Sequence, residues 1–238
     1  ERKRAWWAPK FWARTNLWLQ KVLAGTDSEV TGQENLPVGA YILAPKHQSF
    51  WDTFALVPHI PDAVYILKRE LTWIPFFGWY LGKMNMIPID RGSPAKALRK
   101  VIVEARKRVE QGRQIIIYPE GTRRPPGAEP AYKHGIAEIY SRLDLPVVPV
   151  AHMAGLYWPR RKFLRYPGVI KARFLPPIPP GLSKREFMAR LVEETEKACD
   201  TLLVDAARSK NPPPLPPTAL ERLRQLGVNV SEAAAAAG

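Results

Sequence analysis

Apolar residues form short runs separated by polar turns and by long amphipathic segments. Several runs are continuously aliphatic and rich in β-branched residues, which is typical of strands covered on both faces of a sheet. The predicted strands are residues 40–45, 63–68, 86–90, 114–119, 146–152 and 169–175.

Two long segments between these runs have the signals of helices. Residues 93–112 have Ser93 as a cap, Pro94 in the first turn and Gly112 as a stop, and a second helix follows the cap Ser183. The alternation predicts an α/β domain over residues 28–210, with a mixed, largely parallel central sheet flanked by helices.

Residues 211–220, NPPPLPPTAL, are expected to form neither helix nor strand and to end the compact unit. The chain then closes with the low-complexity stretch EAAAAAG, so residues 211–238 are predicted to be a Pro- and Ala-rich tail.

Residues 1–27 are basic and rich in tryptophan, and Pro9 is expected to start a helix there. Lys3, Lys10, Arg14 and Lys21 share one stripe of the helical wheel, and the broader arc beside it carries Phe11, Trp12, Trp18, Leu19, Val22 and Leu23. This pattern favours an amphipathic helix lying flat at a membrane surface. A helix packed on the domain with its lysines in water is the alternative. The apolar stretch of residues 71–82 is too short to span a bilayer and fits an interfacial segment or a buried loop.

A formal charge of +14 over 238 residues attracts polyanions, namely nucleic acid, anionic lipid or an acidic carrier protein. The single cysteine, Cys199, excludes an internal disulfide and a zinc site built on cysteines. A reducing compartment that faces the cytosol fits this composition best.

His47 and Asp52 follow directly from the predicted strand 40–45. A turn there would bring the Asp52 carboxylate back to one ring nitrogen of His47, leaving the other nitrogen free to act as a base on a hydroxyl. The alternative for this stretch alone is a strand-end histidine and an aspartate at a helix N-terminus.

The stretch YPEGTRR follows the predicted strand 114–119. Gly121 lets the backbone approach a ligand, Thr122 supplies a hydroxyl and Arg123 offers a planar fork suited to phosphate, next to Glu120. Taken alone, the stretch fits a surface turn with solvated arginines better than it fits a ligand site.

A third polar stretch, Asp90-Arg91-Gly92, ends the predicted strand 86–90, and Lys83 lies just upstream. Two cations near a strand end could hold an anionic substrate, whereas a surface pair of Asp90 and Arg91 is the simpler alternative. Because ligand sites of open α/β sheets gather at strand ends, the three stretches together describe a site that deprotonates a hydroxyl on a phosphorylated molecule.

These motifs and their order resemble the glycerolipid acyltransferases of the 1-acyl-sn-glycerol-3-phosphate acyltransferase type. HQSFWD matches the family's histidine, four residues and aspartate, and YPEGTRR matches its Glu-Gly-Thr-Arg block. MIPIDRG and VVPVAH are similar to its other two blocks, although Pro88 departs from the more usual Phe-Ile-x-Arg. The resemblance extends from about residue 30 to 180 and implies a glycerol-3-phosphate acyltransferase-like fold.

The resemblance implies acyl transfer from acyl-CoA or acyl-carrier protein to the sn-2 hydroxyl of lysophosphatidic acid, giving phosphatidic acid. His47 would be the general base and Asp52 would orient its ring, with no metal, no cofactor and no acyl-enzyme. Residues implied to hold or shape the phosphate pocket are Lys83, Arg91, Glu120, Gly121, Thr122 and Arg123, with Glu120 positioning an arginine. 

The enzyme would bind anionic lipids as a peripheral or monotopic protein on the cytoplasmic face of a bacterial inner membrane. Another acceptor, such as glycerol-3-phosphate, a lyso-ornithine lipid or another lysophospholipid, remains an alternative. So does a non-enzymatic basic module for membranes or nucleic acid, although no nucleic-acid-binding signature is present and no such partner is expected.

Overall fold

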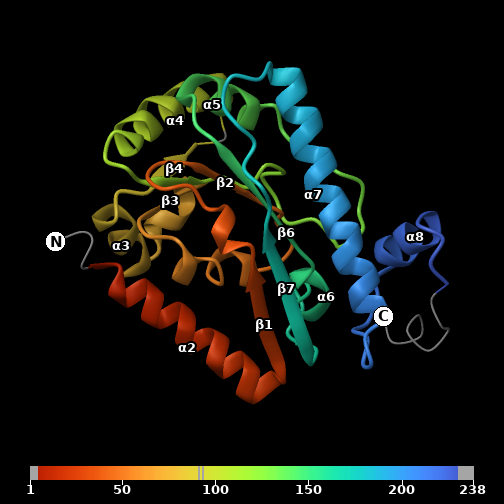
Figure 1. Ribbon diagram of the computed structural model, residues 1–238. Coiled ribbons are helices and arrows are strands. Elements are labelled where there is room, and N and C mark those ends of the chain that lie inside the picture. The colour runs from red at the N-terminus through yellow and green to blue at the C-terminus, as the bar shows by residue number, and fades with distance from the viewer. Residues whose placement is uncertain (1–4, 91, 93, 230–238) are drawn as a thin grey trace.

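Seven strands form one mixed sheet in a computed structural model that describes residues 5–90, 92 and 94–229 (Figure 1). The strands are β1 (Thr26–Thr31), β2 (Ile42–Pro45), β3 (Ala63–Lys68), β4 (Ile87–Ile89), β5 (Gln114–Ile116), β6 (Val147–His152) and β7 (Gly168–Phe174). The helices are α2 (Trp7–Ala24), α3 (Phe77–Lys83), α4 (Pro94–Val109), α5 (Gly135–Leu143), α6 (Ala154–Tyr157), α7 (Lys184–Ala207) and α8 (Pro217–Gln225).

The strand order is β1-β7-β6-β2-β5-β3-β4, and every neighbouring pair is parallel except β6 and β7. β2, β3, β4, β5 and β6 therefore run in one direction, and their carboxyl ends meet at one edge of the sheet. The polar stretches that follow β2 and β5 are adjacent there because these two strands pair directly.

Two apolar cores lie on opposite faces of the sheet, because successive strand residues point to opposite sides. Ile42 and Ile115 belong to the core under α4 and α5, whereas Leu43 and Ile116 belong to the core under α2, α6 and α8. The long helix α7 contributes to both, with Phe187 near its start in the first core. Figure 1 shows α7 running beside β6 and β7, with α2 and α4 on opposite sides of the sheet.

The six predicted strands and the two long helices are confirmed. The Ser183 cap is present, since its hydroxyl accepts a hydrogen bond from the Glu186 amide and the Glu186 carboxylate accepts one from the Ser183 amide. Ser93 lies outside the described residues. β1 was not predicted, because its sequence TDSEVT is almost entirely polar. An edge strand such as β1 tolerates this composition since much of it faces solvent.

The expectation of neither helix nor strand is confirmed for residues 211–216 but is wrong for residues 217–220, which begin α8, and the compact unit does not end here. Pro217 occupies the first position of α8, where its fixed φ suits a helix and its missing N–H costs nothing. Leu215, Ala219 and Leu223 are buried in the core under α2, α6 and α8. Arg222 of α8 forms two hydrogen bonds to the Asp200 carboxylate of α7. The chain from 215 to 228 is thus packed on the domain.

Helix α2 begins two residues before Pro9 and packs against β1. Because β1 spans Thr26–Thr31, the expected domain boundary between residues 27 and 28 falls inside this strand. Its inner side buries Ala13, and the preceding Trp6 is also buried, with its indole N–H donating to Asp62 at 2.8 Å. Its outer side exposes Trp7, Phe11, Trp12, Trp18, Leu19, Val22 and Leu23. Lys3 lies outside the described residues.

Candidate active site

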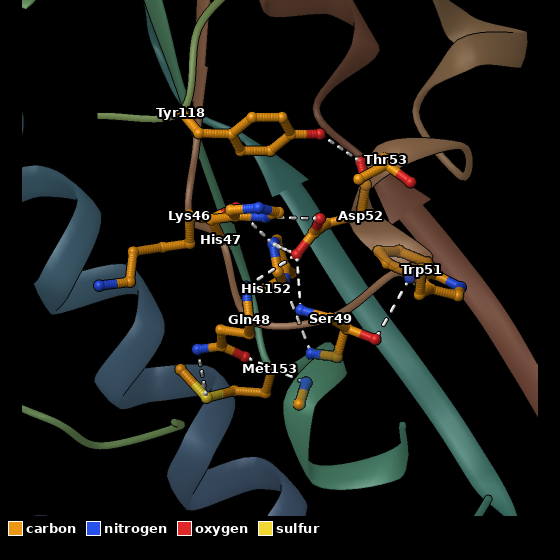
Figure 2. A network of polar contacts seen from close by, with 12 residues as sticks. Lys46, His47, Gln48, Ser49, Trp51, Asp52, Thr53, Tyr118, His152 and Met153 are labelled. Carbon is orange, nitrogen blue, oxygen red and sulfur yellow. Dashed lines mark hydrogen bonds and ion pairs between the residues drawn. The ribbon is translucent and has the colours of Figure 1, made fainter. Parts of the chain in front are cut away.

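His47 and Asp52 form a hydrogen-bonded pair at the carboxyl end of β2 (Figure 2). A 3-10 turn over Trp51–Thr53 folds the chain back, which places Asp52 Oδ1 2.9 Å from His47 Nδ1. Asp52 Oδ2 accepts hydrogen bonds from the backbone amides of Gln48 and Ser49 at 2.8 and 2.9 Å. One buried carboxylate therefore shapes the loop and also holds the imidazole.

This geometry selects the tautomer of His47. An ionised carboxylate only accepts hydrogen bonds, so the proton of a neutral His47 ring lies on Nδ1 and Nε2 keeps its lone pair. The ring stacks on Tyr118 with 4.1 Å between centroids, and the Tyr118 hydroxyl donates to the Asp52 carbonyl at 3.0 Å. Burial keeps the pKa of the Tyr118 phenol well above its usual value, so it remains a neutral donor.

Ser49 is a turn residue in this loop. Its hydroxyl donates to the Trp158 carbonyl at 2.8 Å and accepts a hydrogen bond from the Trp51 amide at 3.2 Å. Because both contacts fix the hydroxyl in the turn, Ser49 has a structural role in this loop.

His152, at the end of β6, supports the loop from behind and was not identified from the sequence. It is fully buried, and its Nε2 lies 2.9 Å from the Lys46 carbonyl while Nδ1 accepts a hydrogen bond from the Ala154 amide at 3.3 Å. Nε2 is therefore the donor, and it lies 3.6 Å from Asp52 Oδ2. Burial lowers the pKa of His152, which favours this neutral form. Cys199 of α7 is distant in sequence, but its thiol lies 4.0 Å from the His152 carbonyl oxygen. Burial raises the pKa of this thiol to about 12.

Lys46 joins the two sequence motifs to α7 through a buried ion-pair cluster. Its Nζ lies 3.0 Å from Glu120 Oε1 and 2.9 Å from Glu196 Oε1, and the Tyr132 hydroxyl donates to the same Glu196 oxygen. Burial acts to lower the pKa of Lys46, but the carboxylates, Glu196 foremost, outweigh it and the pKa is raised. The expectation that Glu120 positions an arginine is wrong among the described residues, because the residue it pairs with is a lysine.

The Glu-Gly-Thr-Arg block meets the histidine loop through the backbone. Gly121 has a left-handed φ of 65° and closes a turn with its amide donating to the Tyr118 carbonyl. The Arg124 amide then donates to the His47 carbonyl at 2.7 Å. Thr122 is exposed and Arg123 is partly exposed, so both side chains are accessible to a ligand near His47.

The structure does not bring all the predicted cations together. Lys83 ends α3 four residues before β4 and therefore lies at the amino edge of the parallel strands, opposite to His47. Arg91 lies outside the described residues, and the neighbouring Asp90 pairs with Arg69 at 2.6 Å. Lys68, the last residue of β3, is exposed at the carboxyl edge.

Comparison with known proteins places these features in a family, since residues 27–153 match the family model described as Acyltransferase. The chain belongs to the Acyltransferase family. A 1-acyl-sn-glycerol-3-phosphate acyltransferase of Pseudomonas aeruginosa is 40% identical over 160 residues, covering 67% of this chain and 62% of that protein. One of Saccharomyces cerevisiae is 26% identical over 216 residues, covering 88% and 71%.

The fold of this chain also matches a solved relative. The crystal structure of the 1-acyl-sn-glycerophosphate acyltransferase PlsC from Thermotoga maritima superposes with a TM-score of 0.70 at 25% identity, covering 84% of this chain and 81% of that one. The chain spans less than two thirds of the length of the Pseudomonas relative.

A broad aromatic surface surrounds the start of the described chain. Beside the outer side of α2, the segment before and within α3 exposes Trp73, Ile74, Phe76, Phe77 and Trp79. The Tyr80 hydroxyl donates to the Ala5 carbonyl at 2.6 Å, which joins α3 to the start of α2. None of the helices in the described part of the chain is both long and apolar enough to cross a bilayer.

Proposed function

We propose that this acyltransferase transfers a fatty acyl group from acyl-CoA or acyl-carrier protein to the sn-2 hydroxyl of 1-acyl-glycerol-3-phosphate. The 2.9 Å contact between His47 Nδ1 and Asp52 Oδ1 carries this proposal, because it leaves His47 Nε2 as a base. The names of the Pseudomonas and yeast relatives support the choice of acceptor.

In the proposed reaction His47 Nε2 removes the proton of the sn-2 hydroxyl as its oxygen attacks the thioester carbonyl carbon. The new C–O ester bond forms, the C–S bond breaks, and the proton on Nε2 passes to the departing thiolate to give a free thiol. Asp52 stabilises the imidazolium that exists between these steps. Such general-base catalysis contributes about 10²–10⁴-fold to the rate.

The substrate phosphate is assigned to cations at the carboxyl edge of the sheet. Arg123 offers a planar guanidinium beside His47, and we retain Arg91 from the sequence motif. Lys68 replaces Lys83 in this proposal, since Lys68 ends β3 on the same edge as His47. Gly121 and Thr122 shape the turn that presents Arg123, and Glu120 fixes that turn through Lys46.

The exposed aromatic side chains of α2 and α3 are proposed to hold the enzyme in the interface of an anionic bilayer, where its lipid substrates reside. Tryptophan prefers the headgroup level, and basic side chains are attracted to anionic lipids. The exposure of these side chains favours the membrane alternative for α2 over complete packing on the domain. A peripheral or monotopic location on the cytoplasmic face of the inner membrane follows from this proposal.

The test is thiol release by purified enzyme in mixed micelles of detergent and lysophosphatidic acid. His47→Ala should lose at least about 100-fold in kcat, by the range for a general base. His59→Ala is the matched control, because this partly buried histidine precedes β3 at the opposite edge of the sheet. Wild-type turnover by folded His47→Ala would reject the mechanism. Activity on glycerol-3-phosphate or a lyso-ornithine lipid, but not on lysophosphatidic acid, would reject the acceptor.

A further inference from the structure

A basic loop with an apolar tip connects α6 to β7. Residues 159–165 read PRRKFLR, and the sequence contains no acidic residue between Asp144 and Glu186. At the tip, Phe163 is 99% exposed and Leu164 is 59% exposed. Four cationic residues therefore surround two adjacent apolar side chains that are mostly exposed to solvent.

The loop is held in a defined shape by Arg165. Its guanidinium lies 3.9 Å from the centre of the Trp158 ring and donates hydrogen bonds to the carbonyls of Lys162, Phe163 and Leu164. Arg161 has a φ of 61°, a conformation that a residue with a side chain seldom adopts. This organised backbone keeps the apolar tip directed away from the core.

The base of the loop is bonded to both sequence motifs of the active site. The Trp158 carbonyl accepts the Ser49 hydroxyl at 2.8 Å, and the Arg160 guanidinium donates to the Arg123 carbonyl at 3.1 Å. A force or a ligand that positions this loop therefore also positions the turn after His47.

An aromatic path connects the loop to helix α2. Trp158 packs against Phe50 and Phe54 with centroid distances of 5.8 and 6.1 Å, and Phe54 packs against Trp12 of α2 at 5.5 Å. Trp158 at the base of the loop is thus linked through the buried Phe54 to Trp12 on the outer side of α2.

We propose that the loop Arg160–Arg165 is a second membrane-binding element, which inserts Phe163 and Leu164 into an anionic bilayer. Its cations lie at the level of the lipid phosphates, as expected for basic side chains that flank an inserted apolar tip. Because the base of the loop is bonded to the turns that carry Ser49 and Arg123, its contact with the bilayer aligns the His47 loop with acceptor molecules in the membrane. This last statement rests on the proposed function, whereas the binding itself does not.

The decisive experiment is flotation of the full chain with vesicles of phosphatidylcholine alone or with added phosphatidylglycerol. Phe163→Ser with Leu164→Ser should weaken binding to the anionic vesicles by at least about tenfold, given the apolar area withdrawn from the bilayer. Val38→Ser is the control, because Val38 is fully exposed but precedes β2 at the opposite edge of the sheet. Unchanged binding by the double variant would overturn the proposal.

The charges are tested with a second matched pair. Arg161→Gln with Lys162→Gln should reduce binding to anionic vesicles at low salt, with little effect at high salt. Arg185→Gln with Lys210→Gln removes two exposed charges elsewhere and should not have this effect. If both loop variants bind vesicles normally but lose turnover only with acyl-carrier protein, the loop is instead a carrier-protein surface and the proposal is overturned.

The kinetic readout separates this inference from the catalytic one. With short-chain substrates dispersed in water, the Phe163→Ser, Leu164→Ser enzyme should keep the kcat of the wild type, while its apparent KM for acceptor in vesicles rises. A similar fall of kcat with both substrate forms would contradict a docking role. Flotation of His47→Ala reports on membrane binding without turnover, so a failure of the general-base mechanism leaves the vesicle result intact.

Discussion

Replacement of Asp52 by asparagine should invert the tautomer of His47 with little change to the fold. In the wild type, Asp52 Oδ1 faces the imidazole and Oδ2 accepts two backbone N–H groups. Asparagine has one oxygen and one NH₂ group. The oxygen should stay with the two backbone donors, because the NH₂ group cannot accept from them. The NH₂ group then faces Nδ1, which becomes an acceptor, and the proton moves to Nε2.

A ring protonated at Nε2 cannot remove a proton from the acceptor hydroxyl. The same exchange in a Ser-His-Asp triad lowers kcat by about 10⁴, and we expect about 10³–10⁴ here. At about 1.4 kcal/mol per factor of ten, this corresponds to about 4–5 kcal/mol of transition-state stabilisation. Asp52→Ala would also leave two buried amides without acceptors, at about 1–3 kcal/mol each, so it would confuse catalysis with folding.

The assay combines thiol release with nitrogen NMR of the His47 ring. Wild type should show a proton on Nδ1 and Asp52→Asn a proton on Nε2, with closely similar denaturation midpoints. The double variant with His47→Ala should be no slower than His47→Ala alone, because both residues act as one unit. Turnover by Asp52→Asn within tenfold of the wild type would refute the reasoning, as would an unchanged tautomer.

Three further substitutions test the surroundings of the site. Lys46→Met should destabilise the fold by about 3–5 kcal/mol, since it leaves the carboxylates of Glu120 and Glu196 without their buried cation; a denaturation midpoint equal to that of the wild type would exclude this. Burial lowers the pKa of His152, so this ring binds a proton more readily in the unfolded chain than in the folded one. The wild type should therefore lose stability as the pH falls below about 6.5, the ordinary pKa of a histidine. His152→Gln should lose less stability than wild type between about pH 7 and 5 in denaturation series, and parallel curves would contradict a neutral buried ring. Leu223→Ala should cost about 2–5 kcal/mol of unfolding free energy, and a negligible loss would show that α8 contributes little to the core.

The sequence predicts those parts of the fold that rest on local pattern. The run of residues 63–68 is apolar and β-branched, and β3 has these same bounds. β1 has no such pattern, because its partner β7 lies about 140 positions away and the pairing, not the composition, makes it a strand. Pro217 in the same way looks like the end of structure until the surface that α8 covers is known.

For the candidate site too, the sequence predicts the contacts between residues close in the chain but not those between distant ones. The spacing of His47 and Asp52 predicts a pair that one turn can form. The contact between Lys46 and His152 joins residues 106 positions apart and depends on the register of β2 against β6, which local sequence does not specify. Lys83 illustrates the opposite error, because proximity in sequence to β4 does not say at which end of the strand a side chain lies.

The double engagement of Asp52 has a consequence for how such a chain changes over generations. In the proposed mechanism the His47 ring acts as the base and otherwise only stacks on Tyr118, whereas Asp52 also holds two backbone amides of the loop. A descendant released from catalysis can lose the histidine at little cost to folding, but loss of the aspartate exposes it to misfolding. Degenerate copies of this domain are therefore expected to lose the base first and to keep the carboxylate as a remnant of the lost activity.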